Sequence, residues 1–224
     1  MKYYRLNHNG LNIKETGTQF QSLSGIAGDI QKDFIPQEGR IDFNFVMPEP
    51  FMEVKAKQTT YLYAMILPSQ FFIFKDYFIT FLKNFNLDEN QDWSIKVHHK
   101  NQIITDYKMF YLNNELQDKI VDFKNSTFKY MNNLELVGFK KFNNSTELVT
   151  DLKKEIFNQK MLYCDELVLD FSKIKFDMIR LSKVPLINGI FISDKLKNEI
   201  EKQSFTGFSF QDIEEIDKRI KVTY

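Results

Sequence analysis

Apolar residues recur with a helical spacing from position 76 onward. Four of them fall at i, i+3, i+4 and i+7, which places their side chains on one face of a helix. They are Phe78, Phe81, Leu82 and Phe85. Asp76 precedes them, and an acidic residue stabilises a helix at its N-terminus. We therefore predict a short helix that packs a phenylalanine-rich face against a core.

A second helix is predicted from Ser193 onward. Leu196 and Ile200 are four residues apart and share one helix face. Ser193 is a favourable N-cap, and Asp194 lies in the first turn. A third helical spacing of apolar residues covers residues 146–159.

Strand patterns occupy much of the remaining chain. Residues 41–45 alternate apolar and polar side chains with a period of two, which is typical of a half-buried strand. The apolar run 61–67 ends at Pro68 and fits either a buried strand or the end of a helix. Further strands are predicted at 2–6, 71–74, 93–97, 166–171, 178–181, 189–192 and 208–210. We expect a loop with one helical turn in 11–30, loops and short elements in 113–150, and a helical spacing in 212–221.

Two segments resemble each other when residues 73–87 are set over residues 191–205. Phe78 then falls on Leu196 and Leu82 on Ile200, and each helix has a predicted strand before and after it. A repeated strand–helix–strand unit indicates a duplicated architecture within one domain. We therefore predict a single domain over residues 1–224, with pseudo-repeat halves around 61–112 and 162–216. The expected fold class is α+β, a mixed or antiparallel sheet with a few packed helices.

Composition and charge narrow the class of protein. The 224 residues are 43% hydrophobic and include 23 Phe, so the chain can bury a large core without disulfides or metals. Seven of these phenylalanines lie in or beside the repeat: Phe71, Phe72, Phe74, Phe78, Phe81, Phe85 and Phe205. Lys and Arg number 30, as do Asp and Glu, and this balance disfavours a nucleic-acid partner.

The sequence favours a cytoplasmic protein. The first fifteen residues contain no apolar stretch typical of a secretory signal, and the most hydrophobic window, 61–85, is interrupted by Pro68 and Lys75. A membrane span needs about 20 consecutive apolar residues, so we expect no membrane partner. The single cysteine, Cys164, fits a reducing compartment.

One triplet is compatible with catalysis. Glu53 and Lys55 flank one residue, and Asp42 lies upstream, which is the outline of a metal-dependent nuclease or hydrolase. The two carboxylates would bind Mg²⁺ and Lys55 would orient a water molecule. The simpler interpretation is a solvated strand end.

Other reactive residue types lack the partners that chemistry requires. His98 and His99 are adjacent, so on a strand they point to opposite faces and cannot chelate one ion, and His8 is the only other histidine. We interpret this pair as an exposed basic strand end. Cys164 has acidic neighbours and no local base, which predicts a packed small hydrophobe.

Glycine-containing segments are also better explained by structure. Residues 25–28, GIAG, lack the Lys-Ser/Thr that follows a phosphate-binding loop. Gly207, after Thr206, can adopt a positive φ and turn the chain into the next strand. We therefore expect no cofactor, no metal site and no catalytic residue.

Several stretches resemble a family of bacterial immunity proteins that are encoded beside polymorphic toxins. This is family eleven of the immunity proteins, formerly a domain of unknown function. The resemblance covers about two thirds of the chain. It rests on LVLD (167–170), SKI (172–174), ISDKLK (192–197), FTGFSF (205–210), the part from 68 to 112 with its KVHHKNQIITDY run, and FNFVMPEP (43–50).

The resemblance implies a non-catalytic protein that neutralises a cognate toxin domain by occluding it. Aromatic residues often anchor such interfaces. The candidates are Tyr3, Tyr4, Trp93, Tyr107 and Tyr111, although core packing explains most of them. The basic residues in 96–100 and the acidic residues in 212–217 could each steer a charged partner. The toxin, its binding surface and the choice between monomer and dimer stay open.

Overall fold

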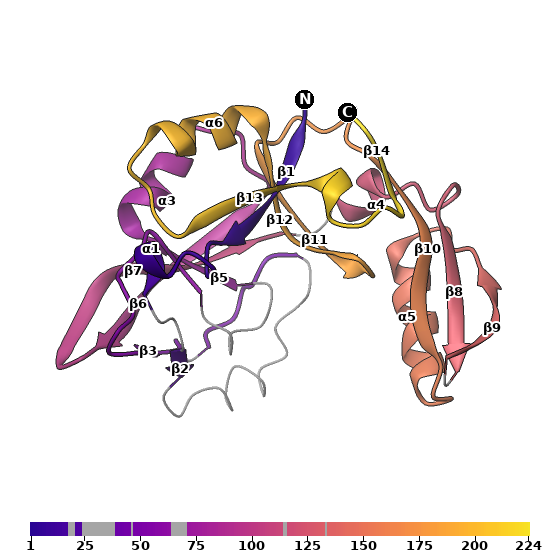
Figure 1. Cartoon of the computed structure of the whole chain (residues 1–224), viewed down its shortest axis with the longest axis horizontal. Coiled ribbons are helices and arrows are strands. Elements are labelled where there is room, and N and C mark those ends of the chain that lie inside the picture. Colours follow the sequence, from indigo (N-terminus) through magenta and orange to yellow (C-terminus); the bar gives the residue numbers. More distant parts are fainter. Residues whose placement is uncertain (18–20, 24–38, 46, 64–70, 114–115, 133) are drawn as a thin grey trace.

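A computed structural model describes residues 1–17, 21–23, 39–45, 47–63, 71–113, 116–132 and 134–224. Within these ranges the chain forms sheets of four, four and six strands with a few short helices (Figure 1). This agrees with the predicted mixture of helices and a mixed or antiparallel sheet. Among the described helices, none combines the length and apolar character that a membrane span requires.

The six-stranded sheet contains the first predicted strand–helix–strand unit. Four of its strands lie in the order β4-β5-β7-β6, and each neighbouring pair is antiparallel. The helix α3 connects β5 towards β6. The elements are β4 (Tyr61–Leu62), β5 (Phe71–Lys75), α3 (Asp76–Leu82), β6 (Asn90–His99) and β7 (Gln102–Leu112). Two further strands, β3 (Pro50–Met52) and β2 (Gln21–Leu23), extend the sheet beyond β6.

A four-stranded sheet contains the second unit and has the same order and directions. Its strands follow β11-β12-β1-β13, again with every neighbouring pair antiparallel. Here the central strand comes from the N-terminus of the chain. The elements are β1 (Tyr3–His8), β11 (Met178–Val184), β12 (Ile187–Ser193), α6 (Asp194–Lys202) and β13 (Phe208–Asp212).

Both predicted helices of the repeat are confirmed. Ser193 caps α6, because its hydroxyl accepts a hydrogen bond from the backbone N–H of Leu196 at 3.1 Å. Leu196 and Ile200 are buried. On α3, Phe78 and Leu82 are fully buried, and Asp76 lies in the first turn.

The two units share one hydrophobic core. Leu6, Phe74, Phe78, Phe110, Ile192 and Leu196 belong to it, and they come from both sheets and both helices. Phe205, which follows α6, packs against α3 with ring centroids 5.1 Å from Phe78 and 4.9 Å from Phe81. Edge-to-face ring pairs of this kind contribute about 1 kcal/mol each beyond their buried area. Figure 1 shows α3 and α6 side by side above the sheets.

Hydrogen bonds cross between the units in a reciprocal way. Thr60, before β4, and Thr206, after α6, bond each other twice through backbone N–H and hydroxyl groups, at 3.1 Å each. Asp177, before β11, accepts a bond from the backbone N–H of Asn86, after α3, at 3.0 Å. Each unit therefore binds the segment that follows the other unit's helix. The duplication itself stays a prediction.

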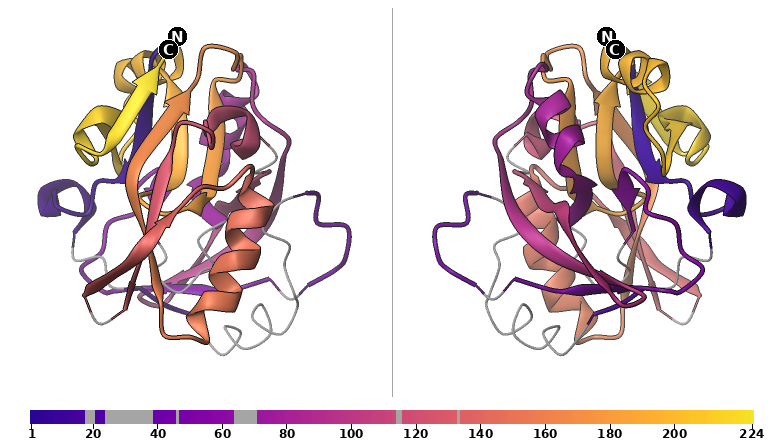
Figure 2. Two further views of the ribbon diagram at one scale, coloured as in Figure 1. Left: turned by 90° about the vertical axis from the view of Figure 1, so that its right-hand side faces the viewer. Right: turned by 90° about the vertical axis from the view of Figure 1, so that its left-hand side faces the viewer.

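The third sheet lies to one side and is mostly built from the middle of the chain. Its strand order is β14-β10-β8-β9. The helix α5 lies alongside it (Figure 2), and α4 packs where it meets the second unit. The elements are α4 (Gln117–Ile120), β8 (Thr127–Asn132), β9 (Glu135–Lys140), α5 (Ser145–Ile156), β10 (Met161–Asp170) and β14 (Ile220–Thr223). The predicted second half, 162–216, therefore begins inside a strand of another sheet.

Two local predictions are wrong, for identifiable reasons. Residues 41–45 form no strand, because the Gln91 side chain bonds the backbone N–H and C=O of Ile41, both at 2.8 Å. Residues 212–221 form only the short 3₁₀ helix η1 (Ile213–Glu215) before Ile220 joins β10 as part of β14. The short elements expected in 113–150 are confirmed, as α4 and the β8–β9 hairpin.

Other predictions are confirmed or fall outside the described residues. One helical turn, α1 (Ile13–Thr16), occurs within 11–30, and α5 occupies most of 146–159. The run 61–67 begins as the strand β4, while residues 64–67 lie outside the described ranges.

A substitution at Gly207 tests how closely the segment after α6 packs against the segment around β4. Its φ is +87°, and a Cβ there would collide with the carbonyl oxygen of Tyr61. We predict that Gly207→Ala lowers the free energy of unfolding by at least about 2 kcal/mol, since both strain and the collision oppose the native backbone. Urea denaturation measures this change. Gly138→Ala is the control, because nothing lies within 4 Å of its added Cβ; equal stability of the two variants would contradict the prediction.

Candidate protein-interaction surface

Exposed apolar side chains are concentrated on the third sheet and the end of α5. Sixteen large hydrophobic residues of the described chain are exposed, and seven of them lie between positions 134 and 161. They are Leu134, Leu136, Val137, Phe139, Ile156, Phe157 and Met161. An apolar concentration of this kind is typical of a surface that binds another protein.

The strand register assigns several of these residues to one face. Met161 pairs with Met131, and Met131 pairs with Leu136, so these three side chains lie in one row across β10, β8 and β9. A second row on the same face contains Tyr163, Lys129 and Phe139. We call this face, defined by Met131, Leu136, Phe139, Met161 and Tyr163, the outer face.

The opposite face is covered by α5. Phe128 and Cys164 are buried in the core on this side together with Leu148 of α5. The hydroxyl of Tyr130 donates a 2.6 Å hydrogen bond to the carboxylate of Asp151, also on α5. This covering fixes the sheet and leaves the outer face to solvent.

The outer face is mainly apolar and includes one charged pair. Phe139 is 62% exposed and Met161 is 63% exposed. Lys129 lies between Tyr163 and Phe139 in the second row and forms an ion pair with Asp165 at 2.7 Å. Protein-binding surfaces are enriched in aromatic and Met side chains, and both kinds are present on this face. The chemistry available here is burial of apolar area, which suits recognition of a folded partner.

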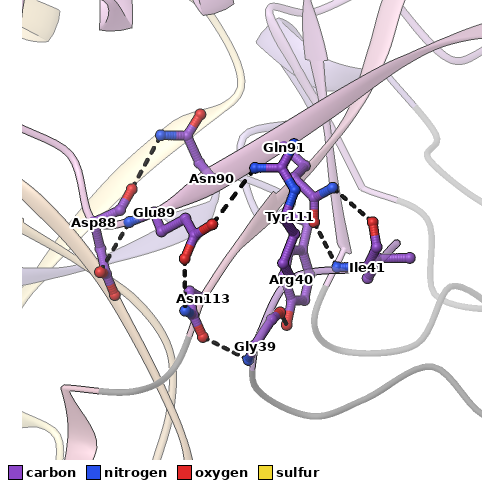
Figure 3. A network of polar contacts seen from close by, with 9 residues as sticks. All are labelled: Gly39, Arg40, Ile41, Asp88, Glu89, Asn90, Gln91, Tyr111 and Asn113. Atoms are coloured by element: carbon purple, nitrogen blue, oxygen red, sulfur yellow. Dashed lines mark hydrogen bonds and ion pairs between the residues drawn. The ribbon is translucent and has the colours of Figure 1, made fainter. Parts of the chain in front are cut away.

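A network of hydrogen bonds and one ion pair is a second group of polar residues that could form a site. It connects residues 39–41 to the start of β6 and the end of β7 (Figure 3). Asn113 accepts a bond from the N–H of Gly39 at 2.7 Å, and the hydroxyl of Tyr111 donates to the carbonyl of Gly39 at 2.9 Å. Arg40 lies 3.5 Å from the carboxylate of Glu89.

These groups bond to one another, as Figure 3 shows. Asn113 also donates to Glu89 at 3.4 Å, and Gln91 bonds both backbone groups of Ile41. The network replaces a strand ladder with side-chain bonds and holds Ile41 in the core beneath the sheet. The network therefore has a structural role, which explains its polar contacts without a ligand.

The three residues of the proposed nuclease motif do not have the context that it requires. Glu53 and Lys55 lie in an exposed turn after β3, and the N–H of Ala56 closes this turn on the carbonyl of Glu53 at 2.9 Å. Asp42 is exposed in an irregular segment. In the described ranges no three His, Cys, Asp or Glu side chains are grouped as metal ligands.

The histidine pair differs from its predicted environment. His98 and His99 do point to opposite faces of β6, but neither is an exposed basic end. His98 stacks on Phe51 with centroids 4.3 Å apart and lies 2.7 Å from the carboxylate of Glu49. His99 is 8% exposed and pairs with Gln102 of β7 and Met52 of β3.

Burial shifts the pKa values of two potentially reactive side chains, Cys164 and His8, and favours the neutral form of each. Burial raises the pKa of the Cys164 thiol to about 12, which confirms the prediction of a packed, unreactive cysteine. Burial lowers the pKa of His8 to about 4, so this ring is neutral at physiological pH. His8 packs between the rings of Tyr61 and Tyr63.

The aromatic candidates mainly contribute to packing. Tyr3, Tyr107 and Tyr111 are buried. The Tyr3 hydroxyl donates to the carbonyl of Phe176 at 2.7 Å, and that of Tyr107 donates to the carbonyl of Thr59 at 2.8 Å. Trp93 and Tyr4 are partly buried. Core packing therefore accounts for the three buried tyrosines.

The remaining candidate segments have structural roles or lie outside the described residues. Gly207 has the predicted positive φ, and Thr206 bonds Thr60. Residues 25–28 lie outside the described ranges.

The two charged clusters are partly paired within the chain. In 96–100, Lys96 lies 3.8 Å from the carboxylate of Glu49. In 212–217, Asp217 pairs with Arg219 at 2.7 Å, and this guanidinium lowers the pKa of the Asp217 carboxyl. Steering of a partner by either cluster stays a prediction.

Comparison with known proteins gives no match, either to a protein-family model or to a curated protein. The resemblance to immunity proteins therefore stays a prediction.

Sequence reasoning did not find the outer face. The apolar residues of β9 and β10 are interspersed with charges, and an extra residue, Val137, breaks the period of two in β9. The available signal was the apolar group at 134–139 within an otherwise polar segment.

Cys164 provides a test of the packing beneath the outer face. At pH 8 a thiol of pKa about 12 is ionised to roughly 10⁻⁴, so native Cys164 should react with a thiol reagent far more slowly than the unfolded chain. In the unfolded chain the pKa of this thiol is about 8.5, so the unfolded state loses the proton first as the pH rises. The free energy of unfolding should therefore fall between about pH 8.5 and pH 12. Absorbance-monitored labelling with and without urea measures the difference. Equal labelling rates would contradict it.

Proposed function

We propose that this chain is a cytoplasmic immunity protein that binds a cognate bacterial toxin domain and neutralises it by occlusion, without catalysis. The exposed apolar outer face supports this proposal most strongly. Its Phe139 and Met161 expose more than half of their surface, whereas Phe128 and Cys164, on the opposite face of the same sheet, are buried. The partner is a folded toxin domain encoded beside this chain.

The architecture supports a binding role in a second way. The outer face lies on a sheet that α5 supports from behind, so its residues are positioned before a partner arrives. A preorganised surface loses less conformational entropy on binding, which increases affinity. A stable complex of standard size would bury about 800 Å² on each partner. Ile156 and Phe157, at the end of α5, are further exposed apolar residues that a partner could cover.

We also propose that the two strand–helix–strand units descend from one duplicated unit. Their identical strand orders and their reciprocal hydrogen bonds support this origin. Superposition of β4, β5, α3, β7 and β6 on β11, β12, α6, β1 and β13 in an experimental structure tests it. One rotation should place Phe78 on Leu196 and Leu82 on Ile200; a shifted alignment of the helices would count against a duplication.

Co-expression with the toxin domain encoded by the adjacent gene tests the function. We predict that the wild-type chain co-purifies with that domain and restores growth to cells that produce it. Phe139→Lys and Met161→Lys should each weaken the complex by at least about tenfold, because each replaces an exposed apolar side chain of the outer face with a charge. Affinity is measured by titration calorimetry on the purified proteins.

Ile103→Lys is the matched control, since Ile103 is 58% exposed but lies on β7 of the six-stranded sheet. It should leave affinity and growth unchanged. No complex together with no rescue would refute the proposed function. A complex that tolerates both outer-face variants would retain the function but refute the assignment of its surface.

A further inference from the structure

The strand β9 is an open edge of its sheet. In the described strand order it is the last member, and β8 is its only partner. One row of its backbone N–H and C=O groups therefore points away from β8, as at any sheet edge. Figure 1 shows β9 at the outer margin of the molecule. Edge strands are usually protected by proline, charged residues, bulges or a covering segment. β9 has a bulge and charged ends, but it contains no proline and exposes Leu136, Val137 and Phe139.

The sequence of β9 is complementary to itself in the antiparallel direction. The strand reads ELVGFK, with Glu135 at its start and Lys140 at its end. If a second β9 runs antiparallel beside it, Glu135 of each copy lies opposite Lys140 of the other. Leu136 then lies opposite Phe139. Opposite charges and apolar pairs both stabilise directly facing positions on neighbouring strands.

The bulge in β9 makes these pairings consistent with the faces of the sheet. Paired residues share a face, and Leu136 and Phe139 pair with Met131 and Lys129, which are two residues apart on β8. Both therefore lie on the outer face, although three positions separate them. Val137 is the extra residue that makes this possible.

Glu135 and Lys140 share the opposite face by the same reasoning. They pair with Asn132 and Phe128, which are four residues apart on β8. In a strand without a bulge, residues five positions apart lie on opposite faces and could not meet across a two-fold axis. The irregularity at Val137 thus allows both kinds of pair at once.

We propose that β9 pairs antiparallel with β9 of a second copy of this chain. The two-fold axis passes between Val137 and Gly138, and the two four-stranded sheets become one continuous sheet. The two outer faces then join, and the contact satisfies backbone groups that the single chain leaves to solvent. This dimer is independent of the proposed immunity function.

Sedimentation velocity over a concentration series tests the dimer on the full chain. The wild type should shift from 26.7 kDa to twice this mass as concentration rises. Glu135→Lys places like charges at both ends of the paired strands and should raise the dissociation constant by at least about tenfold. Lys140→Glu should do the same. An equimolar mixture of the two variants should dimerise again, because each then supplies the charge that the other lacks.

The controls separate this contact from other causes. Lys83→Glu changes the same charge on an exposed residue after α3 and should leave the dimer intact. Lys140 also pairs with Asp151 within the chain, so hydrogen exchange in the wild type is a second measurement that does not depend on that variant folding. Amides of residues 135–140 should exchange more slowly as concentration rises. A wild type that stays monomeric, or a dimer unaffected by Glu135→Lys, would overturn the proposal.

Discussion

The structure depends on one apolar cluster that the two strand–helix units bury together. Neither unit can cover its own inner face, because each has only one short helix, and the two helices meet over the same core. The reciprocal bonds between Thr60 and Thr206 and between Asp177 and Asn86 tie each unit to the end of the other's helix. Burial of aromatic area provides the stabilisation, and these bonds fix the relative position of the sheets.

This arrangement determines what the rest of the chain can present. The other face of the second unit's sheet is buried as well. Its residues Tyr3, Ile179 and Phe191 lie in the core that this sheet shares with the third sheet. The third sheet is thereby held firmly on one side, and α5 fills its inner face. Within the described part of the third sheet, the outer face and the edge at β9 stay exposed. Polar residues elsewhere, such as those around Asn113, bond within the fold.

Much of the repeat could be predicted from the sequence, because its helices have strong local signals. The Ser193 cap and the spacing of Phe78 and Leu82 each determine a structure within a few residues. The segment 41–45 could not be predicted in the same way, since a distant side chain, Gln91, takes the backbone bonds of a strand. The outer face was missed because only the pairing of β9 with β8 reveals which side chains share a face.

Hydroxyl-radical footprinting of the chain, alone and with the co-expressed toxin domain, tests the central claim that the outer face is the surface of recognition. In the free chain, Met161 should oxidise rapidly and Met109 slowly, since the first is 63% exposed and the second is fully buried. Addition of the toxin domain should protect Met161, Phe139 and Leu136 while exposed Val54 and Ile103 keep their rates. Protection of Val54 or Ile103, with Met161 and Phe139 unchanged, would contradict the claim.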